Sequence, residues 1–300
     1  MRVLLVGAAG FLGRFVERGL VDRAYEVWSL DQVSQPAWSV TPHSRWVESD
    51  IRETDWRQFS GFDAVICLAS SLARGRSKSD WVENLNVNVI ALRRLIDWAV
   101  ETASVRSFVF TSSAGMYARE SGHRQITEAS SLSLPAPYWT TKLLMEQLLF
   151  SDEHMQDLRP WVLRLSSPYG PGQPAVSVLP RFVEQAKAGL PLRILDGGYR
   201  AQDFIWVEDA AEAHIRCLEA ALPSAMGPIN LGSGEEITMR YLAETVNSVF
   251  SSAGGSILDV PTDNPDTTCF RLDIDRLRSS LCLTPRTLRE GLERWAQWAH

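Results

Sequence analysis

Tyr138 and Lys142 stand four residues apart in the segment Tyr-Trp-Thr-Thr-Lys, a spacing that puts both side chains on one face of a helix. A free phenol has a pKa of about 10 and is a poor base at neutral pH. A cation within about 5 Å stabilises the phenolate and lowers that pKa. The pair therefore predicts a tyrosine that can take a proton from a substrate. It follows the predicted strand Ser107–Phe110, which leads into Thr111-Ser112-Ser113, and this context makes a chance pairing improbable.

Lysine is rare in this chain. Of its 30 basic residues only Lys78, Lys142 and Lys187 are lysines, and the others are arginines. Lys78 lies in a polar segment and Lys187 late in a predicted helix, so arginine would serve at both positions. At position 142 a compact ammonium has to reach the tyrosine, and a planar guanidinium would place its charge elsewhere. The retained Lys142 therefore favours a catalytic function.

A glycine-rich turn follows the first predicted strand. In Gly7-Ala-Ala-Gly10-Phe-Leu-Gly13 the glycines allow the backbone to approach a pyrophosphate, and the helix that begins there presents its positive N-terminus to that charge. The spacing GxxGxxG is one residue wider than the usual dinucleotide fingerprint. Asp31 stands at the end of the second strand, where a carboxylate accepts hydrogen bonds from the adenosine ribose. Because a carboxylate there repels the extra phosphate of NADP, NAD is favoured.

Short apolar strands alternate with helical patterns through the first 165 residues, which predicts a parallel sheet covered on both faces. The fold class is α/β, a Rossmann-type doubly wound parallel sheet with a smaller C-terminal substrate-binding lobe. Residues 1–165 would form the NAD-binding domain. Residues 166–300 would form mainly the lobe, with some segments returning to the Rossmann domain. The predicted strands are Arg2–Val6, Glu26–Leu30, Arg45–Glu48, Ala64–Leu68, Ser107–Phe110 and Trp161–Leu165. The predicted helices are Leu12–Leu20, Trp81–Thr102, Tyr138–Phe150, Leu179–Ala188, Val207–Ala221, Thr238–Ser251 and Arg286–Ala299.

These residues and others in the same order resemble the extended short-chain dehydrogenase/reductase family of sugar epimerases and dehydratases, in particular enzymes of the UDP-galactose 4-epimerase type. The resemblance covers nearly the whole chain. Besides the motifs above, it includes Asp50-Ile51, Leu68-Ala69-Ser70, Asn88-Val89, Leu163-Arg164, Pro168-Tyr-Gly-Pro-Gly172, Asp203 to Asp209 and Asn230-Leu-Gly-Ser-Gly234. Taken together the motifs are specific, whereas only the glycine turn and the Tyr/Lys pair mean much alone.

The resemblance implies that Tyr138 is the general base, that Lys142 binds the nicotinamide ribose, and that Ser113 hydrogen-bonds the reacting oxygen. It implies NAD as cofactor, in contact with Gly7, Gly10, Phe11, Leu12, Gly13, Asp31, Asp50, Ile51, Leu68, Ala69, Ser70, Asn88, Tyr138, Lys142 and Pro168. The side chains expected to contact the substrate are Ser71, Ser112, Ser113, Tyr138, Ser167, Arg181 and Arg200.

The shared first step in the family is oxidation of a secondary alcohol to a ketone. The related dehydratases and decarboxylases carry an acidic residue shortly before the tyrosine of the fifth-strand motif, because elimination needs an extra acid or base. Here those places hold Ala114 and Gly115, which cannot move a proton. We therefore expect an epimerase acting through a transient ketone. A dehydrogenase of a sugar, uronate or other secondary alcohol, and a non-catalytic NAD-binding module, stay as alternatives.

The substrate signal is weaker. Nucleotide-sugar epimerases hold the diphosphate with an asparagine and two arginines, and this chain has Ser167, Gln202 and either Thr262 or Asp263 at those places. Nearby Arg181, Arg200 and Arg271 could bind a phosphate or carboxylate from shifted positions. A nucleotide sugar is the expected substrate, and a smaller hydroxylated molecule is the competing one.

Composition limits the partners. With 30 basic against 36 acidic residues the net charge is −6 and no basic block is present, so a nucleic acid or membrane partner is not expected. The histidines form no ligand pair, which predicts no metal site. Scattered cysteines at 67, 217, 269 and 282 indicate reduced thiols and a cytoplasmic protein. In the resembling family the helices predicted at Trp81–Thr102 and Tyr138–Phe150 commonly pack into a dimer, so we expect a homodimer.

Overall fold

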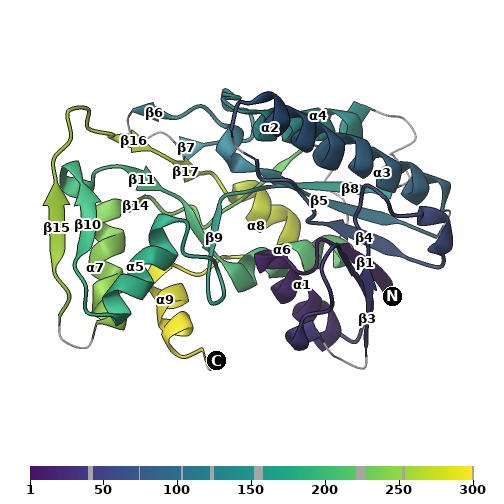
Figure 1. Cartoon of the computed structure of the whole chain (residues 1–300), viewed down its shortest axis with the longest axis horizontal. Coiled ribbons are helices and arrows are strands. Elements are labelled where there is room, and N and C mark those ends of the chain that lie inside the picture. The colour runs from purple at the N-terminus through teal and green to yellow at the C-terminus, as the bar shows by residue number, and fades with distance from the viewer. Residues whose placement is uncertain are drawn as a thin grey trace.

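The structure is a computed structural model that describes residues 1–39, 43–73, 75–102, 104–121, 125–151, 158–220, 227–251 and 254–298. The predicted ends of two helices, at residues 221 and 299, lie outside the described residues. A large parallel sheet with helices on both faces occupies one side of the molecule, and shorter strands with further helices occupy the other (Figure 1).

The predicted doubly wound sheet is confirmed. In the described part of the chain its seven strands are all parallel and lie in the order β3-β2-β1-β4-β5-β8-β13. The order changes direction between β1 and β4, and this opens a crevice at the carboxyl ends of the strands. The strands are β1 (Arg2–Val6), β2 (Glu26–Asp31), β3 (Ser44–Glu48), β4 (Ala64–Cys67), β5 (Ser107–Ser113), β8 (Pro160–Leu165) and β13 (Ile229–Leu231).

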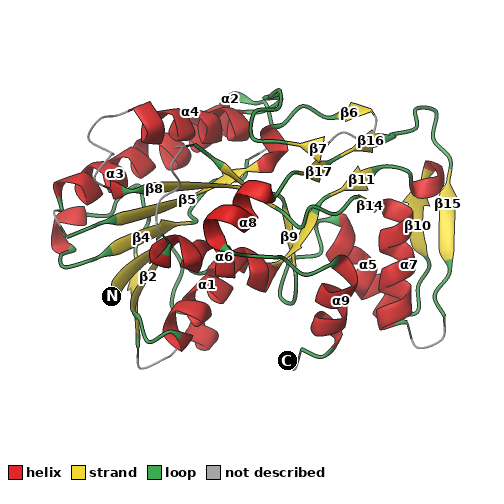
Figure 2. Cartoon of the chain, turned by 180° about the vertical axis from the view of Figure 1, so that it is seen from behind, coloured by secondary structure: helices red, strands yellow, loops and turns green. Residues whose placement is uncertain are grey.

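Helices cover both faces of the sheet, each burying an apolar stripe against it. On one face lie α1 (Phe11–Asp22), α6 (Val207–Glu219) and α8 (Asp275–Leu281), which share a buried cluster with the sheet (Figure 2). On the other face lie α3 (Leu92–Glu101) and α4 (Pro137–Ser151), which share a second buried cluster, while α2 (Lys78–Leu85) packs on α4. Thus α6, α8 and β13, which follow residue 165, belong to the sheet layer.

The helix expected over Trp81–Thr102 is divided in the structure. A π-helix at Asn86–Ala91 separates α2 from α3. Asn84 and Asn88 are buried there, and Asn88 turns its side chain to the loop after β4, where its Oδ1 accepts bonds from Ser70 Oγ at 3.0 Å and Ser71 N at 2.8 Å. A single wide turn of this kind is common next to functional sites. Regular helical periodicity does not reveal it.

The smaller lobe has its own core between α5 (Val178–Lys187), α7 (Met239–Phe250) and α9 (Leu288–Ala296), where Trp206, Leu242 and Leu292 are fully buried. Within the described residues its strands form five short pairs. These are β9 with β12 (Ser167–Tyr169, Phe204–Trp206), β10 with β15 (Leu192–Leu195, Ile257–Val260), β11 with β14 (Ala201–Gln202, Ile237–Thr238), β6 with β16 (Glu120–Ser121, Thr268–Cys269) and β7 with β17 (Gln125–Ile126, Arg271–Leu272).

A buried carboxylate joins the lobe to the sheet. Asp203 is fully buried, and its oxygens accept hydrogen bonds from the backbone N–H groups of Ser233 at 2.8 Å, Gly234 at 3.0 Å and Leu272 at 3.2 Å. Burial raises the pKa of Asp203 to about 6, and these N–H donors oppose that rise because they favour the ionised form. One side chain next to β12 thus holds the loop that leaves β13 and the end of lobe strand Arg271–Leu272.

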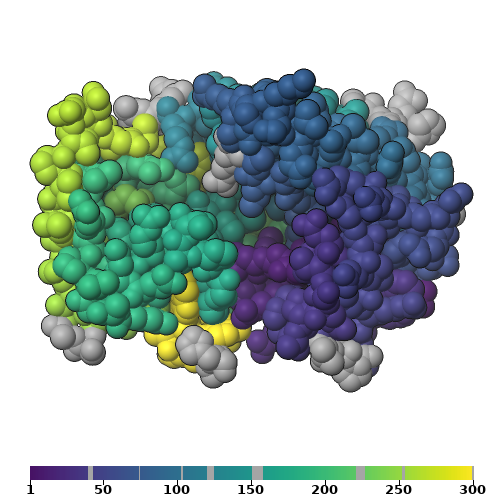
Figure 3. Space-filling model, in the orientation of Figure 1, coloured from purple at the N-terminus to yellow at the C-terminus, as the bar shows by residue number. Residues whose placement is uncertain are grey.

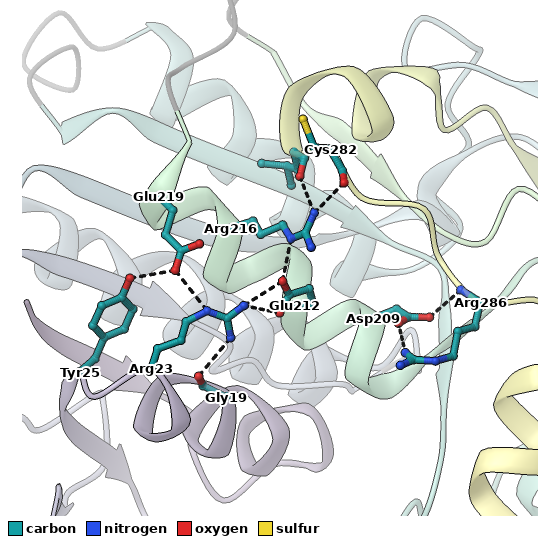
Figure 4. Close-up of polar contacts among 10 residues, drawn as sticks. Gly19, Arg23, Tyr25, Asp209, Glu212, Arg216, Glu219, Cys282 and Arg286 are labelled. Carbon is teal, nitrogen blue, oxygen red and sulfur yellow. Dashed lines mark hydrogen bonds and ion pairs between the residues drawn. The ribbon is translucent and has the colours of Figure 1, made fainter.

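Arginines fix α6 on the outer side of the sheet layer, as Figure 4 shows. Arg23, just after α1, donates two bonds to Glu212 at 2.7 and 2.8 Å and pairs with Glu219 at 3.2 Å. At the start of α6 the buried carboxylate of Asp209 pairs with Arg286, which precedes α9. The Arg23 pairs thus join α1 to α6 within the sheet layer, and the Asp209–Arg286 pair links that layer to the lobe. None of the helices in the described ranges is long and apolar enough to cross a membrane.

Candidate active site

A cavity of about 440 Å³ lies along the carboxyl ends of β1, β2, β4, β5 and β8. Figure 3 shows the surface hollowed where the purple and blue N-terminal part meets the green lobe. Nearly all of the residues predicted to contact the cofactor line this cavity: Gly7, Gly10, Phe11, Leu12, Gly13, Asp31, Asp50, Ile51, Leu68, Ala69, Ser70, Tyr138, Lys142 and Pro168. Asn88 does not line it and instead supports the loop of Ser70 and Ser71 from behind.

The glycine turn leaves no room for side chains. A Cβ on Gly7, whose φ is +88°, would lie 2.5 Å from the backbone nitrogen of Ala69, and one on Gly13 would lie 2.4 Å from the carbonyl oxygen of Ala8. Helix α1 begins directly after Gly10 without a side-chain cap. Its first N–H groups are therefore available to an anion in the cavity, as a dinucleotide pyrophosphate requires.

Two carboxylates define the far end of the cavity. Asp31 Oδ2 accepts a bond from Ala9 N at 2.9 Å, which fixes this carboxylate beside the glycine turn. Asp50 accepts from Arg52, with Nη2 to Oδ2 at 2.6 Å, and this guanidinium holds the pKa of Asp50 below its usual range. The donor groups at the turn and the acceptor at Asp31 suit the pyrophosphate and ribose of NAD, so the residues present fit that cofactor.

The three predicted catalytic residues meet at the other end of the cavity. Lys142 is 2% exposed, and its Nζ donates to the carbonyl oxygen of Thr111 at 2.8 Å and lies 5.9 Å from the centre of the Tyr138 ring. Burial lowers the pKa of Lys142 to about 8. Ser113 Oγ accepts a bond from Gly115 N at 3.2 Å, so its own hydrogen can be donated into the cavity.

Thr111 is itself held from the opposite face of the sheet. Its Oγ1 and His214 Nε2 are 2.8 Å apart, and His214 Nδ1 lies 2.7 Å from the carbonyl oxygen of Ala210. Burial lowers the pKa of His214 to about 4, so this histidine is neutral near pH 7. The carbonyl that binds Lys142 is therefore supported by α6 as well as by its own strand.

Trp139 occupies the place beside Gly115. A Cβ on Gly115 would lie 2.5 Å from Trp139 Nε1, and the Trp139 ring meets the Tyr138 ring edge-on with centroids 5.8 Å apart. The backbone at position 115 therefore has no space for a longer side chain unless Trp139 moves. Of the two positions where an acidic residue would assist elimination, position 115 is thus closed by Trp139, and position 114 holds a buried alanine.

The predicted substrate residues separate into two groups. Ser71, Ser112, Ser113 and Tyr138 line the cavity, although the hydroxyl of Ser112 donates to Glu146. Ser167, Arg181 and Arg200 do not line it. Arg181 is exposed on α5, and Arg200 pairs with Asp266 at 3.4 Å on the surface of the lobe.

Arg119 is a residue that sequence reasoning did not select. Its Nη1 donates to Gln202 Oε1 at 3.2 Å, and Gln202 Nε2 donates to Ser167 Oγ at 3.0 Å. Partial burial and the nearby charge of Arg200 lower the pKa of Arg119, whereas Asp266 opposes the shift. Nothing in the sequence pairs positions 119 and 202, because only the folded lobe brings β11 beside the segment after Tyr117.

The site defines a dinucleotide-dependent enzyme with a tyrosine–lysine pair, and comparisons with known proteins agree. The chain belongs to the NAD dependent epimerase/dehydratase family, whose match covers residues 3–232. NAD is its cofactor, and the resemblance found from the sequence is confirmed.

Among the relatives and solved structures that this chain resembles are UDP-glucose 4-epimerases. A UDP-glucose 4-epimerase of Mycolicibacterium smegmatis is 28% identical and covers 99% of this chain and 98% of its own length. A putative UDP-glucose 4-epimerase of Methanocaldococcus jannaschii is 24% identical, with 99% and 97% covered. The structure of UDP-glucose 4-epimerase from Thermotoga maritima with UDP-glucose shares the fold, with a TM-score of 0.85, 23% identity, and 99% and 98% covered.

Within the ranges that the structure describes, no three His, Cys, Asp or Glu side chains gather as metal ligands. All four cysteines are free, and Cys67, Cys217 and Cys269 are buried.

Replacing Lys142 tests its function directly. We expect Lys142→Ala to lower turnover about 100-fold or more, because the phenolate of Tyr138 loses its cation. In the native protein Lys142 loses its proton as the pH rises through about 8, so kcat should fall above that pH. Lys142→Arg should also be slow, and it should lack this alkaline fall because a guanidinium stays charged. A Lys142→Ala protein with native kcat and native pH profile would contradict the assignment.

Proposed function

We propose that this protein is an NAD-dependent epimerase that inverts a secondary alcohol of a nucleotide sugar through a transient ketone. The observation that carries the proposal is the group of Ser113, Tyr138 and Lys142 at one end of the NAD cavity, with Trp139 closing the place at Gly115. The names of the relatives support epimerisation over net dehydrogenation. A dehydrogenase stays as the second candidate, because its first half-reaction uses the same residues.

The chain's own residues account for the proton transfer. The Tyr138 phenolate takes the proton of the sugar hydroxyl, and the ammonium of Lys142 stabilises that phenolate. The Ser113 hydroxyl donates to the reacting oxygen and holds it beside Tyr138. When bound, NAD supplies the acceptor for the hydride and the donor that returns it. Return to the opposite face of the ketone requires the sugar to turn over, and it requires no further acid or base.

A row of polar side chains supports an anionic substrate. Ser166 and Pro168 line the cavity, and Ser167 between them points to the other side of the strand, toward Gln202. Gln202 in turn accepts from Arg119, whose pKa is lowered in part by the like charge of Arg200. Two guanidinium groups held near each other repel, and a bound diphosphate would relieve that repulsion. Arg119 thus places a cation beside position 202, where the resembling enzymes carry an arginine, although Arg119 and Gln202 do not themselves line the cavity.

We also propose that two copies associate through α2 and α4. These neighbouring helices expose apolar side chains, including Trp81 at 39%, Leu85 at 40% and Leu144 at 42%. Helix α4 covers the sheet with its other face and α2 packs on α4, so the exposed surface of both helices is available to a second copy of the chain. Free thiols at all four cysteines support a reducing compartment, and we place the protein in the cytoplasm.

The reaction is tested with purified protein, UDP-glucose and UDP-glucuronate. NMR should show the 4-epimer of one of them accumulating, with NAD retained by the protein and no net NADH absorbance. Accumulation of NADH without an epimer would favour the dehydrogenase. Tyr138→Phe should abolish the exchange, and turnover that survives both Tyr138→Phe and Lys142→Ala would remove the catalytic assignment altogether.

Substrate anchoring is tested at Arg119. We expect Arg119→Ala to raise KM for a nucleotide sugar about 10-fold with kcat nearly unchanged, because the lost contact acts on ground state and transition state alike. Arg193→Ala, an exposed arginine on β10, is the matched control and should leave both constants unchanged. Unchanged KM in Arg119→Ala would place the anion elsewhere.

Association is tested by light scattering after size-exclusion chromatography. The native chain should have twice the monomer mass of 33.6 kDa, and Leu144→Lys should shift it to the monomer because a charge would be buried in the interface. Leu190→Lys changes a leucine of the lobe that is 53% exposed and should leave the dimer intact. A monomeric native chain would overturn the dimer.

A further inference from the structure

Helix α4 places a third ionisable residue behind the catalytic pair. Tyr138, Lys142 and Glu146 follow one another at intervals of four residues, and their side chains are 6%, 2% and 1% exposed. A glutamate is almost never buried to this degree unless it is paired. The carboxylate of Glu146 is therefore held by specific partners, and these partners lie on two strands of the sheet.

The main partner is Arg164 on β8. Arg164 Nη2 donates to Glu146 Oε2 at 2.6 Å and its Nε donates to Oε1 at 3.0 Å, so the pair is bidentate. The second partner is Ser112 on β5, whose hydroxyl donates to Oε1. Breaking such a buried pair is strongly destabilising, because one charge is left uncompensated. Helix α4 is thus tied to β5 and β8 through a single carboxylate.

Arg164 is itself fully engaged. Its Nη1 donates to the hydroxyl of Tyr117 at 2.8 Å and to the carbonyl oxygen of Glu128 at 3.1 Å, and Tyr117 donates to Asn230 Oδ1 at 2.6 Å. Burial raises the pKa of Tyr117 to about 12, so this phenol stays neutral and can accept and donate at once. The network therefore reaches β13, and it leaves the guanidinium little freedom to move.

Adjacent residues of β5 connect the Glu146–Arg164 pair to the proposed catalytic residues. Lys142 binds the carbonyl of Thr111, and Glu146, one turn further along α4, binds the side chain of Ser112. Two bonds from one helix to neighbouring strand residues fix how far α4 can slide along β5. The next strand residue is Ser113, and the next turn back on α4 carries Tyr138.

We propose that Glu146, paired with Arg164, is a positioning residue for the reaction, holding α4 against the end of β5 so that Lys142 and Tyr138 stay opposite Ser113. The inference rests on the proposed function for its chemistry, and its geometry stands on the contacts above. Glu146 never needs to touch the substrate, and it does not line the cavity.

The carboxylate also acts on the charge of Lys142. Groups facing this ammonium are the Cys67 thiol from β4, Tyr138 and Glu146 from its own helix, and Arg164 behind Glu146. Burial raises the pKa of Cys67 to about 11, so this thiol is neutral at working pH. Glu146 raises the pKa of Lys142 against the larger lowering by burial. Loss of the negative charge should therefore let Lys142 lose its proton at a lower pH.

The test compares Glu146→Gln with the native protein. We expect kcat to fall about 10- to 100-fold, since small misplacements of catalytic groups have effects of that size. KM should stay within about threefold, and the alkaline fall of kcat should move to lower pH by about half a unit or more. Native kcat and an unmoved pH profile in a folded Glu146→Gln protein would overturn the proposal.

Two further variants separate positioning from stability. Asp209→Asn breaks the ion pair of another buried carboxylate, with Arg286, and neither residue lines the cavity, so it should lower the Tm without changing kcat or the pH profile. Ser112→Ala keeps the Glu146–Arg164 charges and removes only the bond to β5. It should lower kcat without moving the pH at which kcat falls on the alkaline side. This variant replaces Glu146→Gln as the test if Glu146→Gln does not fold. Native kcat in Ser112→Ala would then overturn the proposal.

A measurement without substrate tests the positioning by Glu146 independently of which reaction the protein catalyses. The ultraviolet titration of tyrosinate, taken as the difference between each protein and its Tyr138→Phe form, reports the ionisation of Tyr138 alone. In Glu146→Gln this ionisation should move to higher pH, because Lys142 is less charged. If no nucleotide sugar is epimerised but the shift is found, the proposed function fails and the positioning stands. If the sugar is epimerised and the titration does not move, the positioning fails.

Discussion

The buried ion pair between Glu146 and Arg164 is the constraint on which the catalytic end of the molecule depends. Apolar side chains fix a helix on a sheet by the fit of their shapes, and a bidentate charged contact adds hydrogen bonds that are satisfied in one geometry. This pair lies under the junction of α4, β5 and β8. The parallel sheet supplies the rigid frame, and the polar contact selects one position of the helix on it.

The rest of the site follows from where parallel strands end. Backbone N–H groups at the glycine turn, the carboxylate of Asp31 and the catalytic side chains all lie at the same edge of the sheet, because each belongs to a strand end or to the turn after it. One end of the cavity suits phosphate and ribose. At the other end the ammonium of Lys142 is buried away from water. Burial lowers the pKa of Lys142, so the same burial that keeps water from the site also makes its ammonium easier to deprotonate.

Sequence patterns predicted the elements whose signal is local. Apolar strands bounded by turns, the glycine spacing and the Tyr138/Lys142 pair are each written within a short stretch, and the structure brings these site residues together in one cavity. The π-turn at Asn86–Ala91 was missed because buried asparagines, rather than periodicity, set it. Strand β13 was missed because three residues carry too little pattern. A glutamate in a helix is usually exposed, so the burial of Glu146 could not be predicted from the sequence.

Arg119 lies in a different part of the fold from the residues that we propose transfer the proton. The segment that presents Arg119 and the strand that presents Gln202 share no element with Tyr138, Lys142 or Glu146. Under the proposed anchoring by Arg119, exchanging a few lobe residues is a route to new substrates that leaves Tyr138 and Lys142 in place. Evolution and redesign could then change substrate recognition separately from proton transfer.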